Sequence, residues 1–156
     1  MEQSLKPKVT LLFGRICSGK GSYGQPSSRI VVSDVVRYLI KSTDRDKLQE
    51  TSHLDTLIAD KIIELLDAAC KTDWDDAYIV DGIRQVSIVD RILSVYPEAE
   101  LIWLEVPTEE RKRRYEARKD IKDVESFEIA DNKAIELECQ KIFEVFRERL
   151  TIINNY

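Results

Sequence analysis

The residues best suited to chemistry form a short loop near the N-terminus. This loop fits the pattern G-x-x-x-x-G-K and runs Gly14, Arg15, Ile16, Cys17, Ser18, Gly19, Lys20, Gly21, Ser22. Glycines let such a backbone fold into a concave nest whose N–H groups face phosphate oxygens, and a helix that follows adds its positive N-terminal end. A lysine at this position can reach the terminal phosphates as a mobile point charge. The pattern therefore predicts a phosphate-binding loop, and we expect all nine residues to line the site.

The residue after Lys20 departs from the commonest form of this loop. Ser or Thr usually stands there and binds Mg²⁺ through its hydroxyl, but this chain has Gly21, and the hydroxyl comes one position later at Ser22. A glycine-rich turn without a ligand is the alternative interpretation. The position of the segment, between an apolar run and a predicted helix, favours the phosphate loop, with Ser22 as a metal ligand.

Two aspartates follow apolar runs that we interpret as strands, and parallel sheets bind ligands at the carboxyl ends of their strands. Asp34 comes just after the run 29–32, and Asp81 follows the run 78–80. Asp34 could hold water on Mg²⁺ or take a proton from an acceptor hydroxyl, although capping of the following helix would also explain it. Asp81 could serve Mg²⁺ through water, or form a plain turn with the glycine after it. We expect both aspartates at the metal site and Asp34 among the catalytic residues.

Four arginines are candidates for contacts with phosphate groups. Arg37 lies one turn after the first aspartate, and Arg84 lies shortly after the second. Each could hold an acceptor phosphate in a forked, charge-assisted hydrogen bond. Arg114 and Arg118 are spaced i,i+4. With Arg84, they could stabilise the charge on the transferred phosphoryl group.

A solvated helical face is the alternative for these arginines. The segment around Arg114 and Arg118 is rich in both signs of charge, and its acidic residues can pair with basic ones one turn away. We assign the other basic residues of this segment to such a face: Arg111, Lys112, Arg113 and Lys119.

The elements that must position these residues alternate between short apolar runs and longer stretches with helical periodicity. Pro26 lies six residues after Lys20, so the helix that follows the loop is expected to be short. Five strands separated by helices predict an α/β domain with a largely parallel sheet. The strands are predicted over 9–13, 29–32, 78–80, 101–106 and 150–153, and the longer helices over 34–41, 54–69, 85–96, 107–119 and 132–147.

Composition narrows the function classes. The chain has 156 residues, 43% of them hydrophobic and 34% charged, which fits one compact domain over residues 1–156. A formal net charge of −5 provides no overall positive field toward nucleic acid or an anionic membrane. The three cysteines are widely spaced and form no metal or disulfide pattern. No apolar run approaches the length of a membrane span, so we expect a soluble protein of the cytoplasm, or of the host cytoplasm if the source is a virus.

The phosphate loop resembles the G-x-x-x-x-G-K-G-[ST] loop of the P-loop nucleoside monophosphate kinase superfamily. That group includes adenylate, thymidylate and dephospho-CoA kinases, and phage kinases that phosphorylate hydroxymethyluracil in DNA. Segment 33–37 is similar to the acidic-x-x-Arg segment after the second strand of these enzymes, and 81–84 resembles their D-G-F-P-R segment. Residues 114–118 resemble the R-x-x-x-R pair that opens the lid, and 152–154 resemble the closing strand.

The resemblance implies five parallel strands with helices on both faces, and an ATP-dependent kinase that uses Mg²⁺. The chain departs from the family in three ways. The T-G-D segment of adenylate kinases becomes Val32-Ser33-Asp34. The D-G-F-P-R segment is shortened to Asp81-Gly82-Ile83-Arg84, and a lid is nearly absent after Arg118. A lid excludes water from a small free substrate, so an open site could admit a bulkier one.

Several acceptors remain open at this point. A free (deoxy)nucleoside monophosphate and a hydroxymethyluracil base within DNA are the two nucleotide-type acceptors that the resemblance implies. A hydroxyl of dephospho-CoA is an alternative, and a hydroxyl acceptor would need a general base such as Asp34. A nucleotide-binding switch or an NTPase that transfers to water is the alternative from another functional class.

Overall fold

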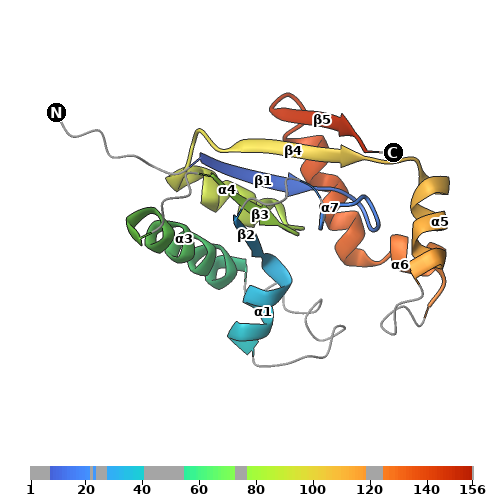
Figure 1. The fold of residues 1–156 in the computed structure, drawn as a ribbon, viewed down its shortest axis with the longest axis horizontal. Coiled ribbons are helices and arrows are strands. Elements are labelled where there is room, and N and C mark those ends of the chain that lie inside the picture. The colour runs from blue at the N-terminus through green and yellow to red at the C-terminus, as the bar shows by residue number, and fades with distance from the viewer. Residues whose placement is uncertain are drawn as a thin grey trace.

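A computed structural model describes residues 8–21, 23, 28–40, 55–72, 77–118 and 125–155 of the chain. Five strands are formed: β1 (Lys8–Phe13), β2 (Ser28–Val31), β3 (Ala77–Asp81), β4 (Glu100–Glu105) and β5 (Leu150–Asn154). The helices of this part are α1 (Val32–Ile40), α3 (Asp55–Thr72), α4 (Val86–Val95), α5 (Thr108–Arg118), α6 (Phe127–Asp131) and α7 (Ala134–Val145). Figure 1 shows them around the sheet.

The strands form one open sheet in the order β2-β3-β1-β4-β5, and every neighbouring pair is parallel. Helices lie on both sides of it, which confirms the predicted α/β architecture. Leu12 on β1 and Val31 on β2 are both in register with Asp81 on β3. The carboxyl ends of three adjacent strands therefore lie at the same edge of the sheet, where parallel sheets bind ligands.

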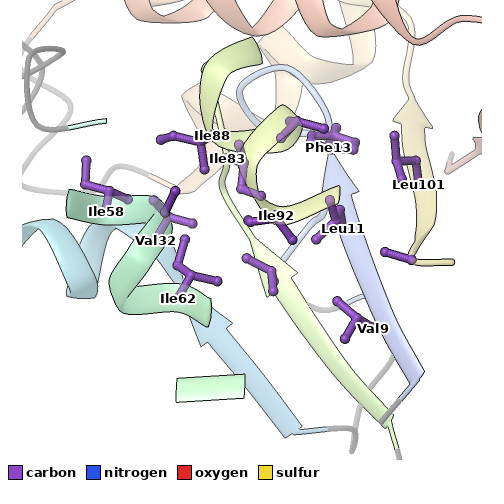
Figure 2. Close-up of a cluster of buried hydrophobic side chains, with 14 of the residues drawn as sticks. Val9, Leu11, Phe13, Val32, Ile58, Ile62, Ile83, Ile88, Ile92 and Leu101 are labelled. Atoms are coloured by element: carbon purple, nitrogen blue, oxygen red, sulfur yellow. The ribbon is translucent and has the colours of Figure 1, made fainter. Parts of the chain in front are cut away.

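The central strand β1 shows why a parallel sheet is buried on both faces. Successive side chains of a strand point to opposite faces. Accordingly, Val9, Leu11 and Phe13 pack into one cluster, whereas Leu12 packs into another with residues of β3 and β4. Helices α1, α3, α4 and α7 contribute to the larger cluster. Figure 2 shows Val32, Ile58, Ile62, Ile88 and Ile92 in it, and Ile142 of α7 belongs to the same cluster.

Local signals explain where several helices begin. Pro107 precedes α5, and the first turn of α5 carries Glu109 and Glu110, which suit the positive end of a helix. The hydroxyl of Ser126 caps α6 by accepting a hydrogen bond from the backbone N–H of Ile129.

The structure confirms the last predicted helix and adds a short one that was not predicted. The predicted stretch 132–147 contains the helix α7, and the short helix before it is α6. The described residues of the phosphate loop, 14–21 and 23, form turns rather than a helix, with the Tyr23 N–H donating to the Lys20 carbonyl at 3.3 Å. The expected short helix and Ser22 otherwise lie outside the described residues. Within the described part, none of the helices is both long enough and apolar enough to span a membrane.

Candidate phosphate-binding site

The loop leaves the carboxyl end of β1 and turns sharply. Cys17 has φ 62°, a rare value for a residue with a side chain, and Gly19 has φ 89°. Alternation of this kind bends the backbone into the concave shape that binds anions. Gly14 is packed tightly at the start of the turn, because a Cβ there would lie 2.3 Å from the Ser18 Oγ and 3.1 Å from the Leu104 carbonyl oxygen.

Lys20 folds back onto the first half of the loop. Its Nζ donates to the carbonyl oxygens of Gly14 at 2.9 Å and Arg15 at 3.3 Å, and to the Ser18 Oγ at 3.4 Å. The Cys139 thiol on α7 also donates to the Gly14 carbonyl, at 3.7 Å. The charge that could bind a phosphate is thus held at the loop by hydrogen bonds to neutral oxygens, which the charged oxygens of a nucleotide can replace.

Side chains from outside the loop bind three further carbonyls of it. Three successive carbonyl oxygens accept such hydrogen bonds: Ile16 from Arg111 Nη1 at 3.4 Å, Cys17 from Arg114 Nη1 at 3.3 Å, and Ser18 from Asn155 Nδ2 at 2.8 Å. A loop whose acceptors are satisfied by the protein keeps its shape without a ligand. This arrangement suits an anion site, because an anion requires donors rather than carbonyl oxygens.

The electrostatics around Lys20 are set by burial and by several charges. Burial lowers the pKa of Lys20, and the Arg84 guanidinium lowers it further, while Glu136 and Asp81 act in the opposite direction. A bound phosphate would supply the negative charge that a buried ammonium lacks.

Arg111 is buried, so its assignment to a solvated face was wrong. Only 5% of the residue is exposed, and its guanidinium binds both oxygens of Asp131, at 2.6 and 3.4 Å. Its Nε also donates to the Val106 carbonyl, and its guanidinium lies over the ring of Phe127. A buried charge is tolerated when it is paired in this way. The partner comes from α6, the helix that was not predicted.

The two arginines spaced i,i+4 on α5, Arg114 and Arg118, lie in different surroundings. Arg114 reaches the loop, and it also donates to the Glu110 carboxylate at 3.1 Å and the Asn155 carbonyl at 2.8 Å. Arg118 is exposed and lies 5.1 Å from the centre of the Tyr115 ring. Arg114 is therefore the arginine of this pair that we place at the loop.

Each predicted metal-site aspartate in the described part forms an ion pair. Asp81 is buried and bonds Arg29 Nη1 at 3.0 Å, and the same nitrogen donates to the Lys20 carbonyl at 2.9 Å. Asp34 has a side chain that is 68% exposed and pairs with Arg37, one turn later on α1. Asp81 is therefore tied to the loop, whereas Asp34 and Arg37 lie on an exposed part of α1.

Arg84 is also paired, with the Glu136 carboxylate of α7. Burial opposes the charge of Arg84, but the attraction of Glu136, together with Cys139 and Asp81, outweighs it and raises the pKa of Arg84. Glu136 is 3% exposed, and its Oε2 accepts no hydrogen bond from the described residues. An unsatisfied buried carboxylate oxygen is unusual and can accept a proton or a hydrogen bond from a ligand.

The residues present fit a nucleotide and its metal in part. Lys20 and the satisfied loop suit the phosphates, and Asp81 is a buried carboxylate that Arg29 connects to the loop. Among the residues that the structure describes, no group of three or more His, Cys, Asp or Glu side chains forms a ready metal cluster. A magnesium ion here would take oxygens from the nucleotide and water, as this ion commonly does.

Five residues at the site were missed by the sequence analysis as functional candidates. One is Arg29, in the second predicted strand, which donates to Asp81 and to the Lys20 carbonyl. Asn155 follows the last strand, so the rule that carboxyl ends of parallel strands meet could have indicated it. Arg111, Asp131 and Glu136 stand on helices without any pattern that separates them from surface charges.

No protein-family model matches the chain, and no curated protein matches its sequence. Similar solved structures include TT1252 from Thermus thermophilus, with a TM-score of 0.63 and 13% identity over 96% of this chain and 89% of that one. Another is shikimate kinase from Bacteroides thetaiotaomicron, with a TM-score of 0.51 and 14% identity over 95% of this chain and 86% of that one. At these identities the likeness concerns the fold: the chain has the α/β architecture of P-loop kinases.

Proposed function

We propose that the protein is an ATP-dependent phosphotransferase that acts on a nucleotide-type acceptor, either a free (deoxy)nucleoside monophosphate or a hydroxymethyluracil base in DNA. The observation that carries this proposal is the loop after β1. Lys20 already lies against this loop, and side chains from other elements already bind its carbonyl oxygens. The likeness of the fold to shikimate kinase supports a kinase over other phosphate-binding proteins. ATP as the donor follows from the resemblance to nucleoside monophosphate kinases.

Each residue near the loop has a role in this proposal. Lys20 exchanges its carbonyl partners for the terminal phosphates, and Arg114, which donates to the Cys17 carbonyl of the same loop, stabilises charge on the transferred group. Magnesium, when bound with ATP, neutralises phosphate charge, and Asp81 and Ser22 are the residues proposed to hold it through water or hydroxyl. Exclusion of water is expected to be limited if the site lacks a lid.

The pairing of charges bears on which acceptor is used. Arg37 and Arg84, the two proposed acceptor clamps, each hold a carboxylate of this chain. A phosphate acceptor must share each guanidinium with a carboxylate or displace it, whereas a neutral hydroxyl need do neither. This observation favours an acceptor that offers a hydroxyl, such as hydroxymethyluracil in DNA or dephospho-CoA. We therefore consider a hydroxyl acceptor beside a free monophosphate.

Transfer of label from γ-labelled ATP with Mg²⁺ tests the proposal. The panel holds nucleoside monophosphates, dephospho-CoA, unmodified DNA and DNA that contains hydroxymethyluracil. We expect label on one nucleotide-type acceptor, and loss of transfer in Lys20→Ala with the fold retained by circular dichroism. Normal transfer by Lys20→Ala would remove the loop from the mechanism. Tight ATP binding without label on any acceptor would replace the kinase by a nucleotide-binding switch.

Two carboxylate variants then separate the acceptor classes. A hydroxyl acceptor needs a base, and Asp34 on α1 and Glu136 on α7 are the two candidates. Loss of the base should lower kcat about 10²–10⁴-fold, so Asp34→Asn and Glu136→Gln identify which carboxylate serves. If Asp34 acts only through the metal, raised Mg²⁺ should partly restore Asp34→Asn. Glu138→Gln, an exposed neighbour on α7 that pairs with Lys141, is the matched control for Glu136.

A further inference from the structure

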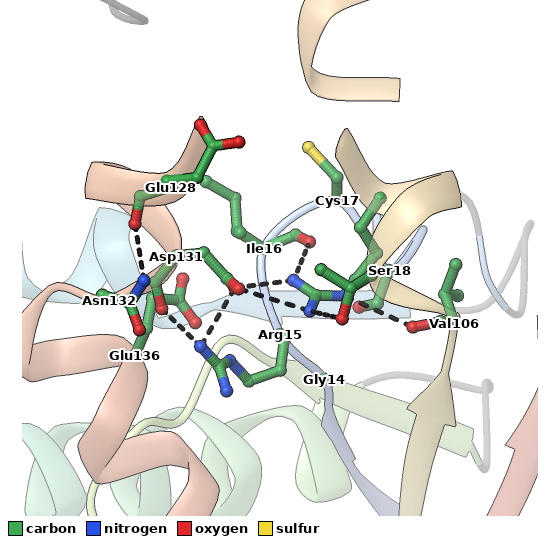
Figure 3. A network of polar contacts seen from close by, with 12 residues as sticks. Gly14, Arg15, Ile16, Cys17, Ser18, Val106, Glu128, Asp131, Asn132 and Glu136 are labelled. Carbon is green, nitrogen blue, oxygen red and sulfur yellow. Dashed lines mark hydrogen bonds and ion pairs between the residues drawn. The ribbon is translucent and has the colours of Figure 1, made fainter. Parts of the chain in front are cut away.

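One carboxylate joins the phosphate loop to the helices that follow β4. Asp131 ends α6, and 8% of the residue is exposed. Its oxygens accept from Arg111 on α5 at 2.6 and 3.4 Å, and Oδ1 lies 3.0 Å from Arg15 Nη2 of the loop. Arg15 also donates to the Asp131 carbonyl oxygen. Figure 3 shows Arg15 and Asp131 facing each other below the turn of the loop.

Through Arg15 and Arg111, Asp131 is connected to two neighbouring residues of the loop. Arg15 is itself a loop residue, and Arg111 donates to the carbonyl of the next one, Ile16. Apolar contacts support the same junction, because Ile16 packs in one buried cluster with Tyr115 of α5 and Phe127 of α6. The carboxylate therefore restrains both the side chain of one loop residue and, through Arg111, the backbone of the next.

We propose that Asp131 is a positioning residue for the phosphate loop, which keeps the turn 15–18 in its phosphate-binding shape before the nucleotide arrives. The proposal rests on the function proposed above, in which this loop binds ATP. It makes the short helix α6 part of the nucleotide site, although Asp131 need not touch ATP.

The direction in which ATP affinity changes when Asp131 is replaced distinguishes a positioning role from simple electrostatics. Asp131 is a negative charge near a site for a polyanion, so by Coulomb attraction alone its removal should strengthen ATP binding. If the carboxylate shapes the loop, its removal should weaken ATP binding. A purely structural role elsewhere would lower the thermal stability and leave the ATP affinity of the folded protein unchanged.

The test compares Asp131→Asn and Arg111→Lys with Glu128→Gln in the full chain. Arg111→Lys keeps the charge but loses the forked contact. Glu128 also lies on α6 and also pairs with a residue of α5, Lys112, but on the surface and away from the loop. The readouts are the dissociation constant for ATP with Mg²⁺ and the hydrogen-exchange rate of the Ser18 amide, which donates to the Arg15 carbonyl at 3.1 Å. The second readout needs no nucleotide.

We expect Asp131→Asn and Arg111→Lys to raise the ATP dissociation constant about 10-fold or more and to speed exchange at Ser18, while Glu128→Gln changes neither. Unchanged or tighter ATP binding in a folded Asp131→Asn variant would overturn the proposal, as would equal effects in Glu128→Gln. If Asp131→Asn does not fold, Asp131→Glu takes its place, because it keeps the charge and displaces the carboxylate; wild-type values for both readouts would then overturn it.

The two proposals fail in different ways. A wild-type protein that does not bind ATP contradicts the proposed function, and the exchange rates at Ser18 still decide whether Asp131 positions the loop. A wild-type protein that binds ATP, with variants that match it in both readouts, contradicts the positioning role alone.

Discussion

Gly19 illustrates how a single residue type is required by its surroundings. Its φ of 89° is unfavourable for residues with a side chain, and a Cβ there would lie 2.4 Å from the Asn155 Nδ2. Gly21, two residues later, has nothing within 4 Å of the corresponding position. The folded structure thus requires glycine at position 19 much more strongly than at position 21.

We predict that Gly19→Ala lowers the free energy of unfolding by about 1–3 kcal/mol, because alanine strains this backbone and displaces Asn155 from Ser18. Gly21→Ala should stay within about 0.5 kcal/mol of the wild type. Urea unfolding of both variants measures the difference. Equal destabilisation by the two substitutions would contradict the environment described for Gly19.

The pKa of Lys20 leads to a prediction for pH dependence. Burial and Arg84 lower this pKa, so the ammonium loses its proton at a lower pH than an ordinary lysine. ATP favours the charged form, and its affinity should therefore fall as the pH rises through the lowered pKa of Lys20. Titration of ATP binding against pH measures this, with Lys20→Arg as the control, since arginine stays charged over the whole range. The nearby Cys139 thiol is not expected to produce this pH dependence, because burial raises its pKa. A pH dependence shared by both proteins would assign the effect to another group.

At the level of elements, α5 and the end of β5 act together on the loop. Arg114 of α5 donates to the carbonyl of Asn155, and both residues donate to successive carbonyls of the loop. The N–H of Asn155 bonds the Glu105 carbonyl at the end of β4, which anchors it to the sheet. The edge strand β5 thus contributes to the site through the residue that follows it.

We predict that Asn155→Ala weakens ATP binding about 5-fold or more, because the Ser18 carbonyl loses a donor worth about 1 kcal/mol. Asn154→Ala is the matched control, since Asn154 is the exposed preceding residue and lies opposite Glu105 in the strand register. Calorimetric titration with ATP gives both constants. Wild-type affinity in Asn155→Ala would show that Arg114 and Arg111 alone hold this side of the loop.

On the scale of the whole molecule, the net charge and the local charges differ in sign. The chain carries a formal charge of −5, yet the loop is surrounded by Lys20, Arg15, Arg111 and Arg114. Two carboxylates compensate part of this charge through ion pairs: Asp131 of α6 pairs with Arg15 and Arg111, and Glu110 pairs with Arg114 on the same helix α5. A polyanion could bind without an overall positive field, because the remaining charge and the backbone donors act at short range.

Nucleotide binding should therefore stabilise the fold as a whole. ATP at about 100 times its dissociation constant stabilises the folded state by about 2.7 kcal/mol, which raises the Tm of a domain of this size by about 5–10 °C. We predict such a shift with Mg²⁺ and ATP for the wild type and none for Lys20→Ala. Thermal unfolding followed by circular dichroism measures it. The same shift in both proteins would place ATP outside the loop.

The sequence alone predicts a large part of this molecule. Apolar runs and helical periodicity predict the five strands and most helices within a few residues, because burial of one face follows directly from local spacing. The sequence predicts the loop equally well, because its glycines and lysine lie within a few residues of each other and the conformations they require are local. The helix α6 is too short for periodicity to reveal.

Only the tertiary structure decides which charged side chains serve the loop. Arg111 and Arg113 are two residues apart and look equivalent in the sequence, but Arg111 is buried against Asp131 whereas Arg113 is exposed and pairs with Glu110. Glu136, far along the chain, meets Arg84 only through packing of α7. Local spacing determines strands, helices and the loop because their hydrogen bonds and strain are local. The partners of buried charges are determined by the packing of distant elements, which no local pattern contains.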